Sequence, residues 1–150
     1  MRFLYVCKQY LRLFFALVLA VTFALAVRMA NVCKLSALQG ERTFYLYSAS
    51  SQCAQTSRLA LSDIPFVRGE SVRLQGQYAV EKGDEIAQNI ARAYGAKLLF
   101  VEYLPAGNCY YLYAPQLGAG ARMGDAVVNL HIAVTGGGCT VGTPLIFGGF

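Results

Sequence analysis

An uncharged apolar run near the amino terminus constrains this chain more than any other feature of its sequence. The run is 15 residues long, begins at Leu13, and follows a basic leader that contains Arg2, Lys8 and Arg12. A helix that is apolar on every face belongs in a membrane or in the core of a cytosolic protein. The basic leader favours the membrane, so residues 1–34 are predicted to form a signal peptide or a membrane anchor.

Cleavage of this segment and its retention are both compatible with the sequence. A membrane-spanning helix needs about 20 apolar residues, whereas the apolar region of a signal peptide needs about 7–15. Ala24 and Ala26 form an A-x-A pattern typical of a cleavage site, but the pattern lies inside the apolar run. Three basic residues precede the run and only Arg28 and Lys34 follow it closely, which places the rest of the chain outside the cytoplasm. The predicted location is the cell membrane, as a single-pass protein with an extracytoplasmic C-terminal domain, or the medium after cleavage.

The positive charge of the chain is concentrated in this N-terminal segment. The net charge is +5, with thirteen basic and eight acidic residues. Five of the basic residues lie within the first 34 positions, and the other eight balance the acidic residues, all of which come later. Nucleic-acid binding requires lysine and arginine clustered on one face of a domain, so no nucleic-acid partner is expected.

The chain has five cysteines: Cys7 lies in the leader, and the other four follow the apolar run, on the predicted extracytoplasmic side. No C-x-x-C motif is present and no histidine lies near a cysteine in sequence, so neither a zinc site nor a thioredoxin-type redox pair is indicated. One disulfide among the candidate cysteines Cys53, Cys109 and Cys139 is predicted, and burial as small apolar residues is the alternative. No metal and no cofactor are predicted.

The remaining residues, 35–150, are predicted to form a single α+β domain. Its expected architecture is an antiparallel sheet of five to seven strands with one helix packed on one face, preceded by the N-terminal hydrophobic helix. Strands are indicated in "RTFYLYSASSQC", "CAQTSRLAL" and "SVRLQGQY". The segment "KGDEIAQNIARAYGAK" predicts a helix from about Gly83 to Tyr94, because two acidic residues open it and a glycine follows it.

A first hairpin is predicted in "AKLLFVEYLPAGNCYYLYAP", with strands on either side of the turn "PAGN". A four-residue loop would place Leu104 opposite Cys109. In this register Tyr111 and Tyr113 share one face with Glu102, and the other face is mainly aliphatic. The hairpin is therefore predicted to have a core face and a tyrosine-rich face that is partly exposed to solvent.

A second hairpin is predicted in "VVNLHIAVTGGGCTVGTPLIFGGF", which contains the only histidine of the chain. A two-residue turn at Gly136–Gly137 places Val134 opposite Cys139 on the apolar face. His131 then lies on the other face, opposite Gly142, with its ring over bare backbone or toward solvent. The spacing indicates no serine-histidine-acid or cysteine-histidine set, so no catalytic residue is assigned.

The segments "YYLYAPQLGAG", "VNLHIAV" and "VGTPLIF", together with the predicted helix, resemble the closing pattern of YwmB-like proteins. These are extracytoplasmic proteins of endospore-forming bacteria, and the resemblance covers roughly residues 84–147. It implies an α+β fold similar to the TATA-box-binding saddle and a link to sporulation, in a family whose function is largely unassigned. It implies no catalytic residue, and the neutral domain argues against DNA binding.

Four tyrosines, Tyr45, Tyr47, Tyr111 and Tyr113, are the candidate binding surface, because tyrosine combines apolar area with a polar tip. The leading hypothesis is a noncatalytic module that binds an envelope or spore-envelope partner, either a protein or a glycan. The alternative interpretation is that these tyrosines only cover a half-buried sheet. The alternative function is a small cell-wall hydrolase that uses His131, whose imidazole ordinarily titrates near neutral pH.

Overall fold

The structure is a computed structural model and describes residues 2–47, 54–76 and 78–147. The chain divides into two units, residues 1–32 and residues 33–150. The predicted boundary between targeting segment and domain lies two residues later than this division.

The first unit is one helix, α1 (Arg2–Val32). Within the described residues, its segment Lys8–Val32 is long and apolar enough to cross a membrane, and none of it is buried against protein. Its 25 residues span roughly 38 Å at about 1.5 Å per residue. The hydrocarbon core of a bilayer is about 30 Å thick. The helix is therefore compatible with a signal anchor or a signal peptide.

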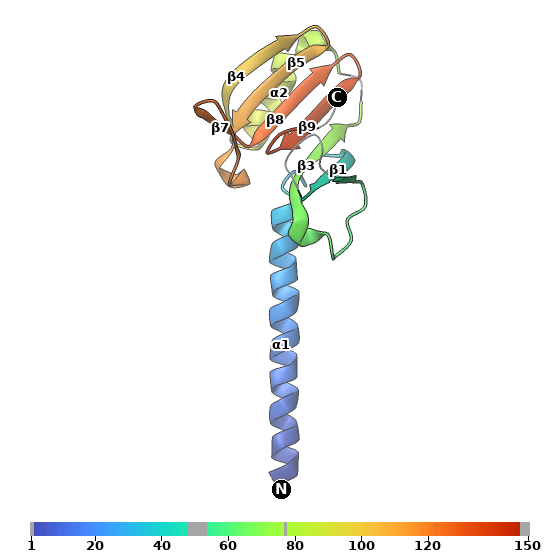
Figure 1. The fold of residues 1–150 in the computed structure, drawn as a ribbon, viewed down its shortest axis with the longest axis vertical. Helices are drawn as coiled ribbons and strands as arrows, with labels where there is room; N and C mark the ends of the chain where they lie inside the picture. The colour runs from blue at the N-terminus through green and yellow to red at the C-terminus, as the bar shows by residue number, and fades with distance from the viewer. Residues whose placement is uncertain (1, 48–53, 77, 148–150) are drawn as a thin grey trace. The chain divides into compact units, whose positions relative to one another are not determined.

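The second unit is built around an antiparallel sheet, seen face-on in Figure 1. Among the described residues it has seven strands in the order β2-β1-β3-β9-β8-β5-β4. The strands are β1 (Gly40–Leu46), β2 (Ala54–Thr56), β3 (Val67–Leu74), β4 (Lys97–Leu104), β5 (Gly107–Tyr113), β8 (Leu130–Thr135) and β9 (Gly138–Thr143). A separate hairpin consists of β6 (Ala121–Met123) and β7 (Ala126–Val128), and short 3₁₀ helices lie at Ile64–Phe66, Val80–Lys82 and Pro115–Leu117. The predicted α+β class and the predicted five to seven antiparallel strands are confirmed.

One helix, α2 (Gly83–Ala93), packs on one face of this sheet, as predicted. Asp84 and Glu85 lie in its first turn, where negative charge suits the helix dipole. Tyr94 caps its C-terminal end, and Gly95 follows with a φ of +52°. Glycine adopts this left-handed conformation without a steric cost, which explains why the helix ends here.

The main hydrophobic core lies between α2 and the sheet. Ala87 and Ile90 of α2 and its C-terminal cap Tyr94 are buried. The sheet contributes alternate residues of its central strands, namely Tyr110, Leu112, Leu130, Ile132, Val134, Cys139 and Val141. The alternation arises because successive residues of a strand point to opposite faces.

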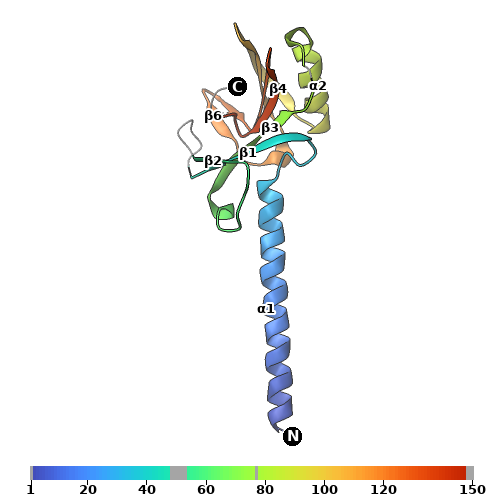
Figure 2. The ribbon, with the colours of Figure 1, turned by 90° about the vertical axis from the view of Figure 1, so that its right-hand side faces the viewer.

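A smaller cluster lies on the opposite face of the sheet. Its buried members are Cys109, Tyr111, Val128 and Ala133, with Leu99, Phe100, Met123, Leu145 and Ile146 packed against them. Figure 2 shows α2 on one side of the sheet and β6 on the other. Both faces of the central strands are therefore covered.

The second predicted hairpin is confirmed in its register. β8 and β9 pair Val134 with Cys139 and His131 with Gly142 around the Gly136–Gly137 turn. Strand β9 ends at Thr143, and the chain then turns back over the second face.

The predicted register of the first hairpin is wrong by two residues. β4 and β5 pair Leu104 with Gly107 and Glu102 with Cys109, so the loop has two residues instead of four. Gly107 has a φ of +151°, and a Cβ there would clash with the carbonyl oxygen of Val134. Glycine therefore lets β5 approach β8 at this point. A slip of two residues keeps each side chain from Phe100 to Leu104 on its predicted face. Before Phe100 the prediction is wrong, because a β-bulge between Leu98 and Phe100 moves Leu99 to the second face.

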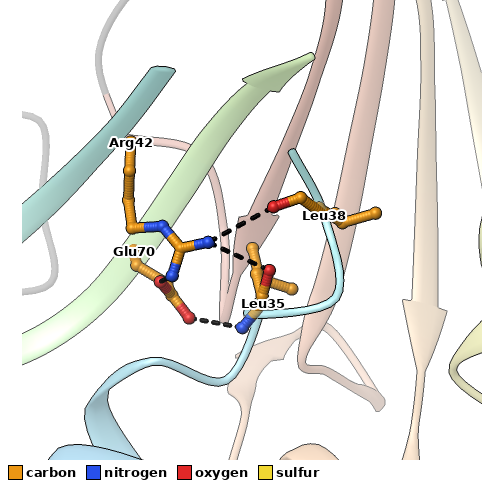
Figure 3. Close-up of polar contacts among 4 residues, drawn as sticks. All are labelled: Leu35, Leu38, Arg42 and Glu70. Atoms are coloured by element: carbon orange, nitrogen blue, oxygen red, sulfur yellow. Dashed lines mark hydrogen bonds and ion pairs between the residues drawn. The ribbon is translucent and has the colours of Figure 1, made fainter. Parts of the chain in front are cut away.

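The chain enters the domain through a buried polar cluster that the sequence did not indicate (Figure 3). Leu35 is fully buried, and its backbone N–H donates to Glu70 Oε1 at 2.5 Å. Glu70 is also fully buried, and its other oxygen lies 3.2 Å from Arg42 Nη1. Arg42 Nη2 donates to the carbonyl oxygens of Leu35 and Leu38. Burial raises the pKa of Glu70, while the Leu35 N–H and the Arg42 guanidinium oppose that rise.

Candidate functional site

The four candidate tyrosines do not form one exposed surface. Tyr45 and Tyr111 are only 2% and 7% exposed, whereas Tyr47 and Tyr113 are 60% and 36% exposed. The expected surface is wrong for the buried pair, because the chain beyond β9 covers them. Phe147 packs edge-on against Tyr45 with ring centroids 5.2 Å apart. Tyr45 and Tyr111 are thus part of the packing of the second face.

The candidate cysteines do not form the predicted disulfide where the structure describes them. Cys109 and Cys139 are buried free thiols, and they belong to clusters on opposite faces of the sheet, so no bridge joins them. Cys53 lies outside the described residues. Burial raises the pKa of Cys139 to about 12 and also raises the pKa of Cys109. Both thiols are therefore protonated near neutral pH, which makes them poor nucleophiles.

His131 lies on the second face, as predicted, but it does not face solvent. Its ring is 4% exposed and stacks on Tyr111 with centroids 4.4 Å apart, and Tyr111 in turn stacks on Phe100. The backbone N–H of Ile146 donates to His131 Nδ1 at 3.2 Å. Gly142, opposite His131, leaves room for Ile146, because a Cβ there would lie 2.7 Å from its Cγ1. The covering segment thus separates the imidazole from solvent.

Burial lowers the pKa of His131 to about 4, and this shift makes the stability of the domain pH-dependent. In the unfolded chain the imidazole binds its proton near pH 6.5, so stability is lost as the pH falls from about 6.5 to about 4. The full loss is about 3 kcal/mol. We expect His131→Phe, which retains a ring on Tyr111, to flatten this pH dependence when denaturant unfolding in detergent micelles is compared at several pH values. Parallel decreases in the two proteins would contradict the prediction.

A groove lies between α2 and the edge strand β4. Its volume is about 280 Å³, near the lower limit of about 300 Å³ for small-molecule pockets. α2 contributes Asp84, Ala87, Gln88 and Ala91, β4 contributes Leu98, Val101 and Tyr103, and Tyr110 and Leu112 of β5 form the floor. The small side chains of Ala87 and Ala91 leave this space beside the helix.

Large apolar side chains continue from the groove along the edge strand. Leu98 is 47% exposed and Tyr103 71%, and both line the groove. Leu104 is 44% exposed but lies on the other face of the strand. Isolated exposed apolar residues are common on protein surfaces, but a contiguous group beside a concavity is typical of an interaction site. We call this groove and its exposed margin the α2–β4 groove.

One end of the α2–β4 groove is polar. The Tyr110 hydroxyl donates to Asp84 Oδ1 at 2.9 Å and accepts a hydrogen bond from Asn108 Nδ2 at 3.3 Å. Burial raises the pKa of Tyr110 to about 12, so its hydroxyl is a neutral donor near neutral pH. Gly83 permits this arrangement, since a Cβ there would lie 2.5 Å from the Tyr110 hydroxyl. Asp84 is the one charged residue among the described residues that line the groove.

Sequence reasoning missed this groove because it depends on where α2 lies over the sheet. The apolar periodicity of the helix predicts that it packs on the sheet but not which strands it leaves uncovered. Leu98 and Tyr103 in an edge strand were the available signal, since both are large and apolar in a strand that turned out to be open on one side.

Comparisons of the chain with family models, with curated proteins and with solved structures found no match. Among the residues that the structure describes, no three histidine, cysteine or acidic side chains are grouped to hold a metal ion. The functional argument therefore depends on the geometry of the α2–β4 groove.

Proposed function

We propose that this chain is a membrane-anchored extracytoplasmic module that binds an extended segment of an envelope protein in the α2–β4 groove. The observation that carries the proposal is the apolar groove beside an edge strand whose large side chains are exposed. The apolar helix Lys8–Val32 supports the membrane anchor. The positive N-terminal flank supports the outward orientation of the domain.

A protein segment fits the α2–β4 groove better than a glycan. The floor and walls are mainly aliphatic and aromatic, whereas a glycan would need several polar partners for its hydroxyl groups. Strand β4 lies at the edge of the sheet, where an extended peptide can run alongside it. A β-bulge at Leu98/Phe100 interrupts the regular edge, so the side chains of the segment are expected to contribute more than strand pairing.

The charge of the groove specifies one more property of the bound segment. Asp84 is exposed at the polar end, and no lysine or arginine is among the described lining residues. A segment with two or three apolar side chains and a lysine or arginine at the end near Asp84 is complementary to this site.

Selection of displayed random dodecapeptides on the full chain in detergent micelles tests this proposal. We expect enriched peptides with apolar residues and one basic residue, and an affinity at least about tenfold lower for Leu98→Asp, because the substitution places a charge in an apolar contact. Asp84→Asn is expected to reduce the preference for the basic residue.

Val127→Asp is the matched control, since Val127 is 45% exposed and lies in β7, away from the groove lining. The control should bind the selected peptides like the unmodified protein. A failure to enrich any peptide, or equal binding by Leu98→Asp, would contradict the proposal.

Membership of the YwmB-like family and a role in sporulation stay predictions. A hydrolase that uses His131 gains no support from the geometry, because the ring is buried beneath the chain that follows β9.

A further inference from the structure

A second exposed apolar group lies at the opposite end of the sheet order, where β1 ends and β3 begins. Tyr47 is 60% exposed, Leu61 69% and Phe66 43%. The backbone N–H of Tyr47 donates to the carbonyl oxygen of Phe66 at 2.8 Å, and the two ring centroids lie 5.0 Å apart. Two segments far apart in the sequence therefore hold these rings together. We call Tyr47, Leu61 and Phe66 the aromatic corner.

The charged side chains near the aromatic corner in sequence are mainly positive. Arg58 and Arg68 are exposed, and Arg68 Nε donates to the carbonyl oxygen of Tyr47. Asp63 is the acidic residue of this loop, and its carboxylate accepts hydrogen bonds from the Ala60 N–H and the Ser62 hydroxyl. The corner thus combines exposed apolar and aromatic groups with two arginines that are available to anions.

The aromatic corner is also close to the point where the chain enters the domain. Leu35 donates to Glu70 of β3, and Phe66 directly precedes the first residue of that strand. Glu70 lies four residues after Phe66, so the distance between them along the strand is roughly 13 Å at about 3.3 Å per residue. Leu35 itself follows the end of α1 by three residues, which span at most about 11 Å.

We propose that the aromatic corner inserts into the headgroup region of the membrane that holds α1. Tyrosine and phenylalanine with flanking arginines match this region, where aromatic rings meet the boundary of the acyl chains and arginine meets phosphate. The membrane of α1 is favoured as the partner because only a short chain segment joins α1 to Leu35, and Leu35 is bonded to the same strand that Phe66 precedes. The proposal rests on the membrane anchoring proposed above, but not on peptide binding in the α2–β4 groove.

The test uses the full chain in vesicles of phosphatidylcholine with a minor share of phosphatidylglycerol. Benzoylphenylalanine, a photoreactive analogue, replaces one aromatic residue in each of three proteins: Phe66→benzoylphenylalanine for the corner, Phe23→benzoylphenylalanine for the anchor and Tyr103→benzoylphenylalanine as the control. Tyr103 is 71% exposed and lies in the α2–β4 groove, so it reports ordinary surface exposure. Lipid adducts are measured by mass spectrometry after illumination, and circular dichroism confirms that each protein is folded.

We expect lipid adducts at position 23 and, at position 66, a yield about fivefold above that at position 103, because only an inserted side chain stays in contact with lipid. Adding Arg58→Gln should lower the yield at position 66 about twofold, and only in vesicles that contain phosphatidylglycerol. Labelling at position 23 with equal yields at 66 and 103 would overturn the corner proposal and leave the anchor in place. No labelling at position 23 would overturn the anchor and the corner together.

Discussion

Replacing Arg42 with alanine is expected to lower the free energy of unfolding by about 3 kcal/mol near pH 8. The fully buried Glu70 carboxylate would lose its charge partner, and the carbonyl oxygens of Leu35 and Leu38 would lose a donor. The buried negative charge would then be left with the backbone N–H groups of Leu35 and Lys34 and the more distant charge of Lys34. Denaturant unfolding of the full chain in detergent micelles, followed by tyrosine fluorescence, measures the effect.

The size of this loss should depend on pH in a defined direction. The pKa of Glu70 is already raised by burial, and removal of Arg42 would raise it further. Protonation then relieves the penalty, so the deficit of Arg42→Ala should shrink as the pH falls toward 5. Arg68→Ala is the control, since Arg68 is exposed and in the adjacent part of β3, and it should change stability by less than about 0.5 kcal/mol. Equal effects of the two substitutions would exclude the buried cluster as a main determinant of stability.

Asn129→Ala is expected to cost about 3 kcal/mol as well, for a different reason. Asn129 is fully buried between β7 and β8. Its side-chain oxygen accepts from the Ala114 N–H at 2.7 Å, and its Nδ2 donates to the carbonyl oxygens of Ala114 and Gly118, both at 2.8 Å. Alanine leaves three backbone groups without these partners in a region that water does not reach.

A second substitution at the same position separates hydrogen bonding from volume. Asn129→Asp keeps the size of the side chain but places an oxygen where Nδ2 faces two carbonyl oxygens, so at neutral pH it should be at least as unstable as Asn129→Ala. Asn89→Ala, on the exposed face of α2, should stay within about 0.5 kcal/mol of the unmodified protein. A stable, folded Asn129→Asp protein would show that the hydrogen bonds of Asn129 do not hold residues 114–118 in place.

Local signals explain why parts of the fold could be predicted from the sequence. Acidic residues at the start of α2 and Gly95 beyond its end act within a few residues of the helix, so its bounds were correct. The β8–β9 register was correct because the Gly136–Gly137 turn and the apolar alternation agree on one pairing. In the β4–β5 hairpin the alternation permits slips of two residues, and the requirement for glycine where β5 approaches Val134 arises only in the folded sheet.

Non-local contacts explain what could not be predicted. Tyr45 and Tyr111 occupy strand positions that alternate with core residues, a pattern that predicts a face open to water. The segment after β9 covers that face. The burial of Glu70 depends on Arg42 and on Leu35, which lies 35 residues earlier. No periodic pattern connects these positions, and an isolated charged residue in a strand ordinarily indicates an exposed side chain. The α2–β4 groove was missed for a related reason, since its shape depends on the packing position of a whole helix.

The entry of the chain at Leu35 also determines how the domain would respond to mechanical load. A pull on α1 reaches the domain at Lys34, whose Nζ donates to the carbonyl oxygen of Leu117, and at Leu35. The Leu35 side chain belongs to the main core, and its N–H is bonded to Glu70. Glu70 lies in β3, an interior strand with neighbours on both sides, so the force is shared by two ladders of backbone hydrogen bonds. Forced unfolding is governed by the unfolding rate, and a load spread over an interior strand opens a sheet more slowly than one that peels an edge strand. The buried cluster around Glu70 therefore gives a tethered domain an attachment suited to tension.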